Sequence, residues 1–141
     1  LKSAIQKYLN VDSLVAEHIY NFSMQIISAT VPRINAKTHE ELGASYWLSV
    51  ERAINIAKNE ANVFLNYADY TKAVKSGKTS KTWISMGDES VRLTHAEVDG
   101  ETIPIAEYFT VGDSLMMFPH DAMHGASESE LVGCRCSVWY Q

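Results

Sequence analysis

The chain has 141 residues, of which 46% are hydrophobic, and carries a formal net charge of −5. This length fits one compact domain with a useful core and excludes a string of many small domains. No run approaches the roughly 18 uninterrupted apolar residues of a transmembrane helix, so we expect no membrane partner. The two cysteines stand two positions apart near the end, which excludes a disulfide framework. Because the first residue is Leu1 and not Met, we expect a piece of a longer protein.

The charge is distributed unevenly along the chain. Residues 1–81 carry ten Lys or Arg and seven Asp or Glu, a net charge of +3, whereas residues 82–141 carry two and ten, a net charge of −8. The acidic total argues against a protein that simply coats nucleic acid. The split indicates that the two halves have different roles.

The first half is expected to be helical. Apolar residues recur at steps of three and four over residues 14–29, Asp12 precedes them as a candidate N-cap, and Pro32 follows the expected end. A second start signal is Thr38 with Glu41 three residues later, the pattern of a capping box. We therefore predict one helix that ends before the proline and a new helical start after it.

A longer apolar stripe runs at helical spacing over residues 50–68 and predicts a helix of about seven turns that ends near Gly77. The segment around its end, residues 71–81, contains no acidic residue and four lysines: Lys72, Lys75, Lys78 and Lys81. Such a run either contacts phosphate groups or is a solvated loop, and its composition alone leaves both readings open.

In the second half the pattern changes to that of short strands. Residues 82–86 are aromatic and β-branched and end at Gly87, which predicts a strand. Asp88 should then begin a short helix that carries His95. Residues 102–105 predict a brief edge strand, because the proline in them cannot donate to a ladder.

Residues 107–129 are predicted to be irregular, and residues 131–140 alternate with period two. This alternation predicts a final strand with both cysteines on one face and Arg135 on the other. The order of the elements predicts an α+β fold, in which N-terminal helices with a long central helix are followed by a small antiparallel sheet with a short helix.

Thiol and imidazole groups in the second half suggest a zinc site. The candidate ligands are His95, His120, His124, Cys134 and Cys136. However, Cys-x-Cys differs from the Cys-x₂₋₄-Cys spacing of typical structural sites, and a second cysteine pair is missing. The alternative is two small buried strand residues beside loop histidines, since free cysteine is among the most buried residue types.

A second candidate site centres on Arg92 and His95, which lie one helical turn apart and could face a common site. The acid that orients them could be Asp88, Asp99 or Glu60. A histidine beside an arginine is compatible with a metal-independent nuclease. The alternative is a structural network in which the arginine pairs with an acid such as Asp88 and the histidine caps backbone groups, with Arg135 reaching the same acids.

The order of these pieces resembles the phage Mu F-like head morphogenesis family, the minor head proteins of tailed phages. The resemblance covers about residues 50–141 and begins with the helical segment Ile56-Ala57-Lys58-Asn59-Glu60, which looks like the family's Ile-Ala-Arg-Thr-Glu. The residues that match the family's spaced motifs are Lys81, Trp83, Asp88, Val91, Arg92, His95, Asp99, Gly100, Pro119, Asp121, Cys134, Arg135 and Cys136. We therefore divide the chain into a helical N-terminal segment, residues 1–49, and a Mu F-like domain, residues 50–141.

The chain departs from the family's pattern at several of these positions. His120 stands in place of the usual Gly, and Gly133 in place of the usual Asn. Some family members carry Cys-x-x-Cys where this chain has an arginine and a histidine, and they look like a zinc version of the domain. Because those thiols are missing, we expect no metal or other cofactor here. A polar network of Glu60, Asp88, Arg92, His95 and Arg135 would replace the metal in stabilising a small domain.

The resemblance implies a minor protein of the phage head, located inside the capsid after assembly in the host cytoplasm and associated with the portal protein. Known relatives bind DNA, so we expect contact with double-stranded DNA during packaging or ejection through Lys58, Lys72, Lys75, Lys78 and Lys81. In some phages this domain is fused to other domains, including toxins.

Three hypotheses follow from the sequence. The first is a non-enzymatic minor head protein, which we favour. The second is a nuclease or toxin-like effector domain that uses His95 with Arg92 or Glu60. The third is a binding module stabilised by zinc.

Overall fold

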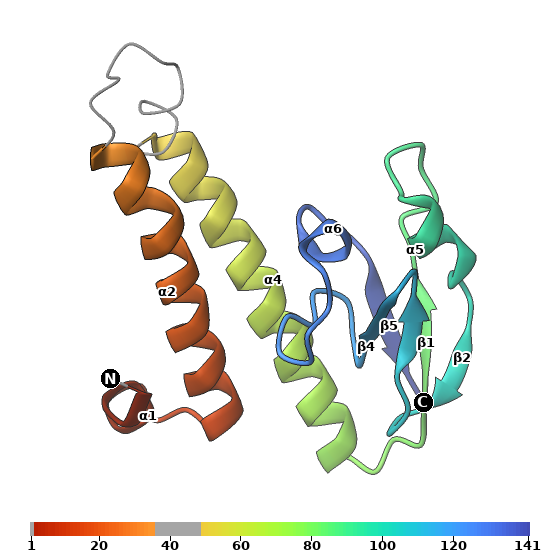
Figure 1. Cartoon of the computed structure of the whole chain (residues 1–141). Coiled ribbons are helices and arrows are strands. Elements are labelled where there is room, and N and C mark those ends of the chain that lie inside the picture. Colours follow the sequence, from red (N-terminus) through yellow and green to blue (C-terminus); the bar gives the residue numbers. More distant parts are fainter. Residues whose placement is uncertain (1, 36–48) are drawn as a thin grey trace. The chain divides into compact units, whose positions relative to one another are not determined.

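The computed structural model describes residues 2–35 and 49–141 (Figure 1). It consists of two compact units, Leu1–Ala57 and Lys58–Gln141, and one long helix passes through the boundary between them. Helices come first, and short strands with short helices follow, which confirms the predicted α+β class. None of the described helices is both long and apolar enough to cross a membrane.

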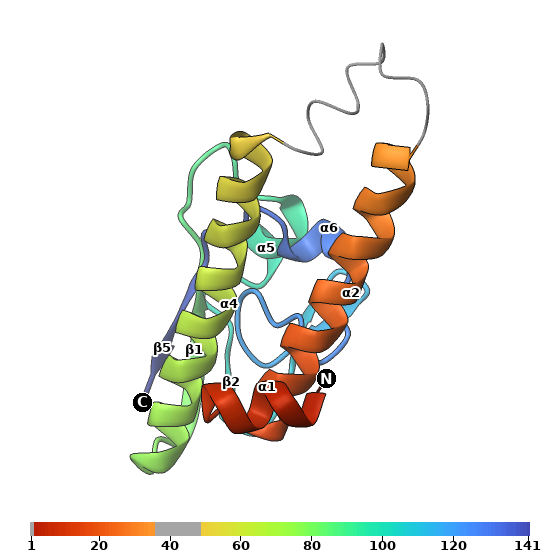
Figure 2. The same cartoon turned by 90° about the vertical axis from the view of Figure 1, so that its left-hand side faces the viewer.

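The first unit contains α1 (Lys2–Leu9) and α2 (Ser13–Asn35) (Figure 2). The predicted N-cap is confirmed, because the Oδ1 atom of Asp12 accepts a hydrogen bond of 2.9 Å from the amide of Val15. The predicted end of this helix is wrong, since α2 continues past Pro32. A proline removes one amide donor from a helix, which weakens it without always ending it. The capping-box pattern at residues 38–41 lies outside the described residues.

Helix α4 (Val50–Lys75) ends where the sequence predicts. Gly77 adopts φ +75°, and the amide of Lys78 bonds to the carbonyl of Ala73 at 3.1 Å. A left-handed residue with a bond from the next amide back across the last turn is the usual glycine C-cap. The chain therefore leaves α4 at a fixed angle and enters the first strand three residues later.

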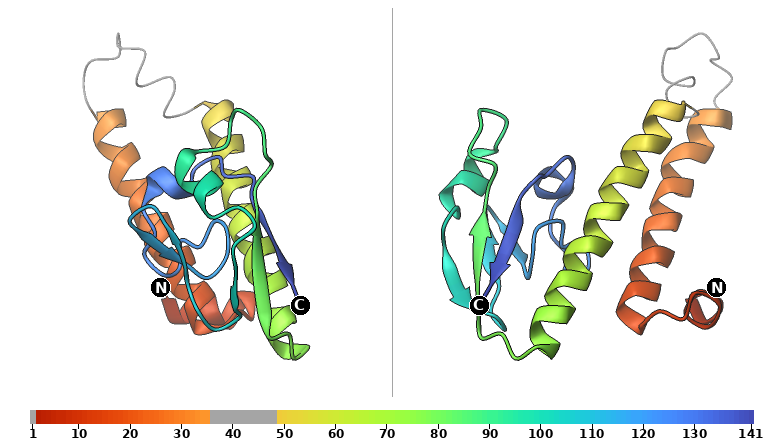
Figure 3. Two further views of the ribbon diagram at one scale, coloured as in Figure 1. Left: turned by 90° about the vertical axis from the view of Figure 1, so that its right-hand side faces the viewer. Right: turned by 180° about the vertical axis from the view of Figure 1, so that it is seen from behind.

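The second unit has a three-stranded antiparallel sheet in the order β2–β1–β5, and β5 lies beside β1 in both views of Figure 3. The central strand is β1 (Ser80–Ile84), between β2 (Thr102–Pro104) and β5 (Ser137–Tyr140). The predicted edge strand is confirmed. The final strand is shorter than predicted, because residues 131–136 form the end of a helix and a loop.

A β-hairpin occupies part of the region predicted to be irregular. It consists of β3 (Phe109–Val111) and β4 (Ser114–Met116), joined at Gly112, which has φ +58°. Each strand has a buried residue at both ends and an exposed one between them, so the alternation lasts for only three residues. A pattern this short falls below the four to eight residues on which strand prediction depends, although the Gly-Asp pair was a visible turn signal.

Two short helices complete the second unit. Helix α5 (Leu93–Glu97) starts later than predicted, because Asp88 closes a turn by accepting a 3.0 Å hydrogen bond from the amide of Ser90. Helix α6 (Glu128–Leu131) precedes the loop that leads into β5. The core under the sheet contains Trp83, Val98, Phe109, Val111, Met116, Cys134 and Cys136, so both cysteines are core residues.

Candidate functional site

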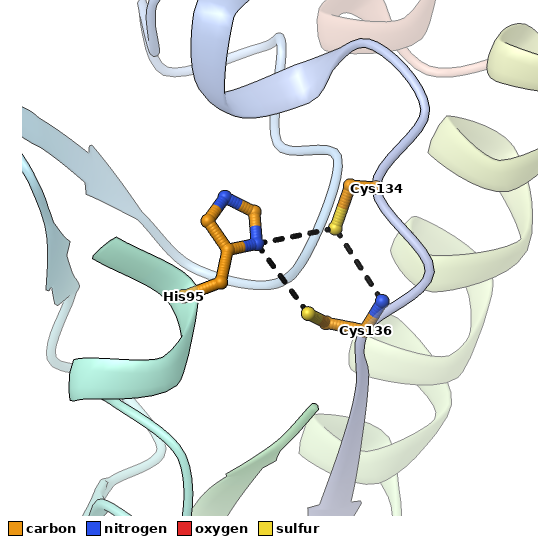
Figure 4. Close-up of side chains that lie close together, drawn as sticks. All are labelled: His95, Cys134 and Cys136. Carbon is orange, nitrogen blue, oxygen red and sulfur yellow. Dashed lines mark hydrogen bonds between the residues drawn. The ribbon is translucent and has the colours of Figure 1, made fainter. Parts of the chain in front are cut away.

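Three side chains of the second unit converge on one point, one from α5 and two from the loop before β5 (Figure 4). The Nδ1 atom of His95 lies 3.4 Å from Sγ of Cys136 and 3.6 Å from Sγ of Cys134. All three residues are buried: the exposed fraction is 1% for His95, 8% for Cys136 and 3% for Cys134. We call these three residues the His95 cluster.

Three hydrogen bonds fix the loop that carries the two cysteines. Gly133 adopts φ +70°, and its amide donates to Oδ1 of Asn59 on α4 at 3.1 Å. The amide of Cys134 donates to the carbonyl of Leu131, and Nε2 of His120 lies 2.6 Å from the carbonyl of Cys134. These bonds satisfy backbone groups that a buried loop would otherwise leave unpaired, so the two thiols are held in place.

The second ring nitrogen of His95 faces a carboxylate. Its Nε2 atom lies 3.0 Å from Oε2 of Glu130, which also accepts a 2.8 Å hydrogen bond from the hydroxyl of Thr94. The ring of Trp83 packs edge-on against the imidazole, with centroids 5.6 Å apart. Because Nε2 donates to the carboxylate, Nδ1 is the nitrogen left as an acceptor toward the sulfurs. Sequence reasoning missed Glu130, which had no signal beyond its position four residues before Cys134.

The two thiols have opposite electrostatic environments. The hydrogen bond from Cys134 lowers the pKa of Cys136 to about 5, and the neighbouring His95 acts in the same direction. The same hydrogen bond, together with burial, raises the pKa of Cys134. Of the two thiols, Cys136 is therefore the one that loses its proton more easily.

Three members of the expected polar network, Asp88, Arg92 and Arg135, bond to groups other than His95, although both arginines line a hollow beside the cysteines. Asp88 and Arg135 form an exposed ion pair of 2.6 Å, and each side chain is nearly half exposed. The guanidinium of Arg92 donates to the carbonyl of Val132. Glu60 is half-buried on α4. The structure thus gives His95 a different carboxylate partner, Glu130, from the one that the sequence suggested.

The remaining histidines of the candidate zinc set have other partners. His120 adopts φ +63°, its Nε2 atom bonds to the Cys134 carbonyl, and burial lowers its pKa. The Nδ1 atom of His124 lies 2.7 Å from both carboxylate oxygens of Asp121. Among the described residues, the side chains grouped closely enough to hold a metal are those of the His95 cluster.

The lysines proposed for DNA contact separate into two kinds. Lys58, Lys72, Lys75 and Lys78 are exposed. Lys81 is fully buried: its Nζ donates to the carbonyl of Met117 at 2.8 Å and lies 5.1 Å from the ring centre of Phe109. Burial lowers the pKa of Lys81 to about 8. Its place at the second position of β1 turns the side chain into the core, away from any nucleic acid at the surface.

Two small hollows border the His95 cluster. One of about 10 Å³ is lined by His95, Arg92 and both cysteines, among others. Another of about 240 Å³ is lined by Asn62, His120 and both cysteines, among others. Both are smaller than the roughly 300–1,000 Å³ of typical small-molecule sites.

Comparison with known proteins identifies the family. A family model described as Phage Mu protein F like protein matches residues 25–139. The chain belongs to the phage Mu protein F-like family. Membership confirms the resemblance that the spaced motifs indicated, and it supports a role in phage head morphogenesis.

A curated relative of the Mu F-like chain is the NAD(+)–arginine ADP-ribosyltransferase EFV of Enterococcus faecalis. The two are 33% identical over 104 residues, which cover 71% of this chain and 20% of the relative. The Mu F-like chain thus spans about a fifth of that protein's length. No solved structure matches it significantly.

Proposed function

We propose that the Mu F-like chain is a minor head protein of a tailed phage, located inside the capsid, associated with the portal protein and in contact with double-stranded DNA. The observation that carries the proposal is the family match across residues 25–139, which covers most of the chain. The described residues add a compact second unit with small hollows and buried polar groups, which suits a structural component of the head better than an enzyme with an open cleft.

The DNA contact would be local, because the chain as a whole is acidic. Lys72 and Lys75 lie in the last turn of α4 and Lys78 in the turn that follows, and all three are exposed. Lys58 lies on the same helix, roughly 21 Å before Lys72 at 1.5 Å per residue. Lysines at such positions provide phosphate contacts that do not depend on base sequence.

DNA binding can be tested by fluorescence anisotropy with a duplex at several salt concentrations. The variant K72Q/K75Q/K78Q should bind more weakly, and the slope of its salt dependence should fall by about 0.9 for each phosphate that is no longer neutralised. The control Q6E/Q25E/S28E changes the net charge by the same three units at exposed positions of α1 and α2. Equal weakening by both variants, or no binding of wild type at low salt, would contradict the proposed contact.

Portal association and location can be tested in the phage. Coexpression with the portal protein of the same phage should yield a complex that survives size-exclusion chromatography. In purified virions the chain should resist added protease until the capsid is opened. A chain that is digested in intact virions would contradict a capsid-interior location.

A second candidate function is that of an effector, and the similarity to the ADP-ribosyltransferase is the observation that favours it. The activity in that protein's name belongs to the whole relative, and the present chain matches only one fifth of it. If this shared part were catalytic, the purified chain would transfer ADP-ribose from NAD⁺ to an arginine acceptor or cleave nucleic acid, and H95Q would abolish it. We expect neither activity, with or without a chelator.

A further inference from the structure

The His95 cluster has a property that does not depend on any role in the phage head. Its three potential ligand atoms, one imidazole nitrogen and two sulfurs, all lie within 4.8 Å of one another. They come from α5 and from the loop before β5, two segments about forty residues apart in the chain. We propose that His95 Nδ1 and the thiolates of Cys134 and Cys136 bind one zinc ion, which joins these two segments.

The spacing of the ligand atoms fits zinc. A tetrahedral zinc ion with a bond of about 2.3 Å to sulfur and about 2.0 Å to nitrogen holds the two ligand atoms about 3.5 Å apart. The distances from Nδ1 of His95 are 3.4 Å to Cys136 and 3.6 Å to Cys134. Both distances match this value, and the two sulfurs lie within 4.8 Å of each other. Thiolate and imidazole ligands also select zinc over magnesium or calcium, which prefer oxygen.

The groups around the cluster are those that support a metal ligand set. The Nε2 atom of His95 pairs with Glu130 at 3.0 Å, the carboxylate–histidine arrangement that orients metal-binding imidazoles. The amide of Cys136 donates to Sγ of Cys134 at 3.4 Å, a bond that a thiolate accepts better than a thiol. The indole of Trp83, which packs against His95, also acts as a hydrogen-bond donor toward the sulfur of Cys136. A metal-bound thiolate at Cys136 would keep this acceptor.

The charges of the site would cancel with zinc bound, and the hollow beside it has room for a further ligand. Two thiolates and Glu130 carry three negative charges, which a zinc ion and Arg92 at the edge of the hollow would offset. The hollow of about 10 Å³ that borders His95 and both cysteines has room for one water molecule. A water there would complete four-coordination, as in sites with three protein ligands.

The same residues in the order Cys136, His95, Glu130 could instead form a thiol nucleophile with its base and orienting acid. Two features favour the metal. Both sulfurs face the same nitrogen, whereas a nucleophile needs only one. In addition, the side chains are buried, and both adjoining hollows, of about 10 Å³ and about 240 Å³, are smaller than typical small-molecule sites.

Metal content is the first test. The full chain, purified under reducing conditions without chelator, should contain one zinc ion per molecule by elemental analysis. After replacement by cobalt(II), the spectrum should show thiolate-to-metal charge transfer and tetrahedral d–d bands. C136S and H95Q should lose these bands, whereas H124Q, a histidine paired with Asp121, should keep them. E130Q should bind cobalt about 10–100-fold more weakly.

Thiol reactivity in the wild-type protein keeps the test independent of variant folding. With zinc present, both cysteines should resist alkylation by N-ethylmaleimide, and removal of zinc by a chelator should expose them. The proposal is overturned by a metal-free protein that takes up neither zinc nor cobalt. Rapid alkylation of Cys136 alone with zinc present would overturn the proposal in favour of the nucleophile. A protein mass that is two hydrogens lower than the mass of the reduced chain would overturn it in favour of a disulfide between the two cysteines.

Discussion

The second unit contains two buried histidine-bearing clusters that satisfy their polar groups in different ways. In the Asp121 cluster, one carboxylate accepts hydrogen bonds from the amides of Met117 and Met123 and pairs with His124. In the His95 cluster, two thiols compete for a single imidazole nitrogen. The first cluster is complete with protein atoms alone, whereas the second has an arrangement that a cation would complete.

This difference indicates how each loop of the domain is held. The loop at residues 117–124 is fixed by a buried carboxylate that is surrounded by donors. Its stability should therefore not depend on metal or on oxidation. The loop at residues 132–136 depends on sulfur chemistry, so its stability should respond to metal and to oxidation. The following experiments test this contrast, from the largest expected effect to the smallest.

The largest effect is expected from D121N. The side chain of Asp121 is fully buried, and an amide at this position would present its own donors to the amides of residues 117 and 123. Loss of one partner from a buried charged arrangement costs about 3–5 kcal/mol in the free energy of unfolding. Urea denaturation of wild type and D121N measures this difference in the free energy of unfolding. D113N, an exposed turn residue, is the matched control and should change stability little.

A somewhat smaller effect is expected from removal of metal. If zinc binds the folded chain, a chelator should lower the free energy of unfolding by about 2.7 kcal/mol relative to a free zinc concentration of 100 times its Kd. C136S should be insensitive to the chelator, while D121N should retain the full sensitivity. A chelator effect of equal size in C136S would place the metal elsewhere.

The pH dependence of Lys81 should be smaller again. Burial lowers its pKa from 10.5 to about 8, so between these pH values the unfolded chain binds more protons than the folded one. Stability contributed by this residue therefore rises with pH across that window. From pH 7.5 to 9.5, wild type should gain about 1–2 kcal/mol relative to K81M. The exposed K78M should follow wild type, and parallel pH curves for wild type and K81M would show that the buried ammonium does not titrate there.

The smallest effect is expected at the exposed ion pair between Asp88 and Arg135. Each side chain is nearly half exposed, so solvent screens the attraction. R135Q should leave the thermal unfolding midpoint unchanged within error, even though Arg135 lies between the two cysteines. A large destabilisation would mean that this arginine supports the cysteine loop.

Much of the fold could be predicted from local patterns. Asp12 and Gly77 marked the ends of helices because capping depends on neighbouring atoms only. The hairpin at Gly112 was missed because its strands have three residues each, too few for a period to show. Pro32 misled the prediction of a helix end, since one lost hydrogen bond does not always stop a helix.

The sequence by itself determined the α+β class, the family and the alternation that places both cysteines on one side of the chain. Only the tertiary structure decided their partners. In the folded chain, His95 contacts the two sulfurs through Nδ1 and pairs with Glu130, not Glu60, through Nε2. Lys81 is buried in the core. The physical reason is that spacing along the chain fixes which way a side chain points, whereas the packing of distant segments fixes what it meets.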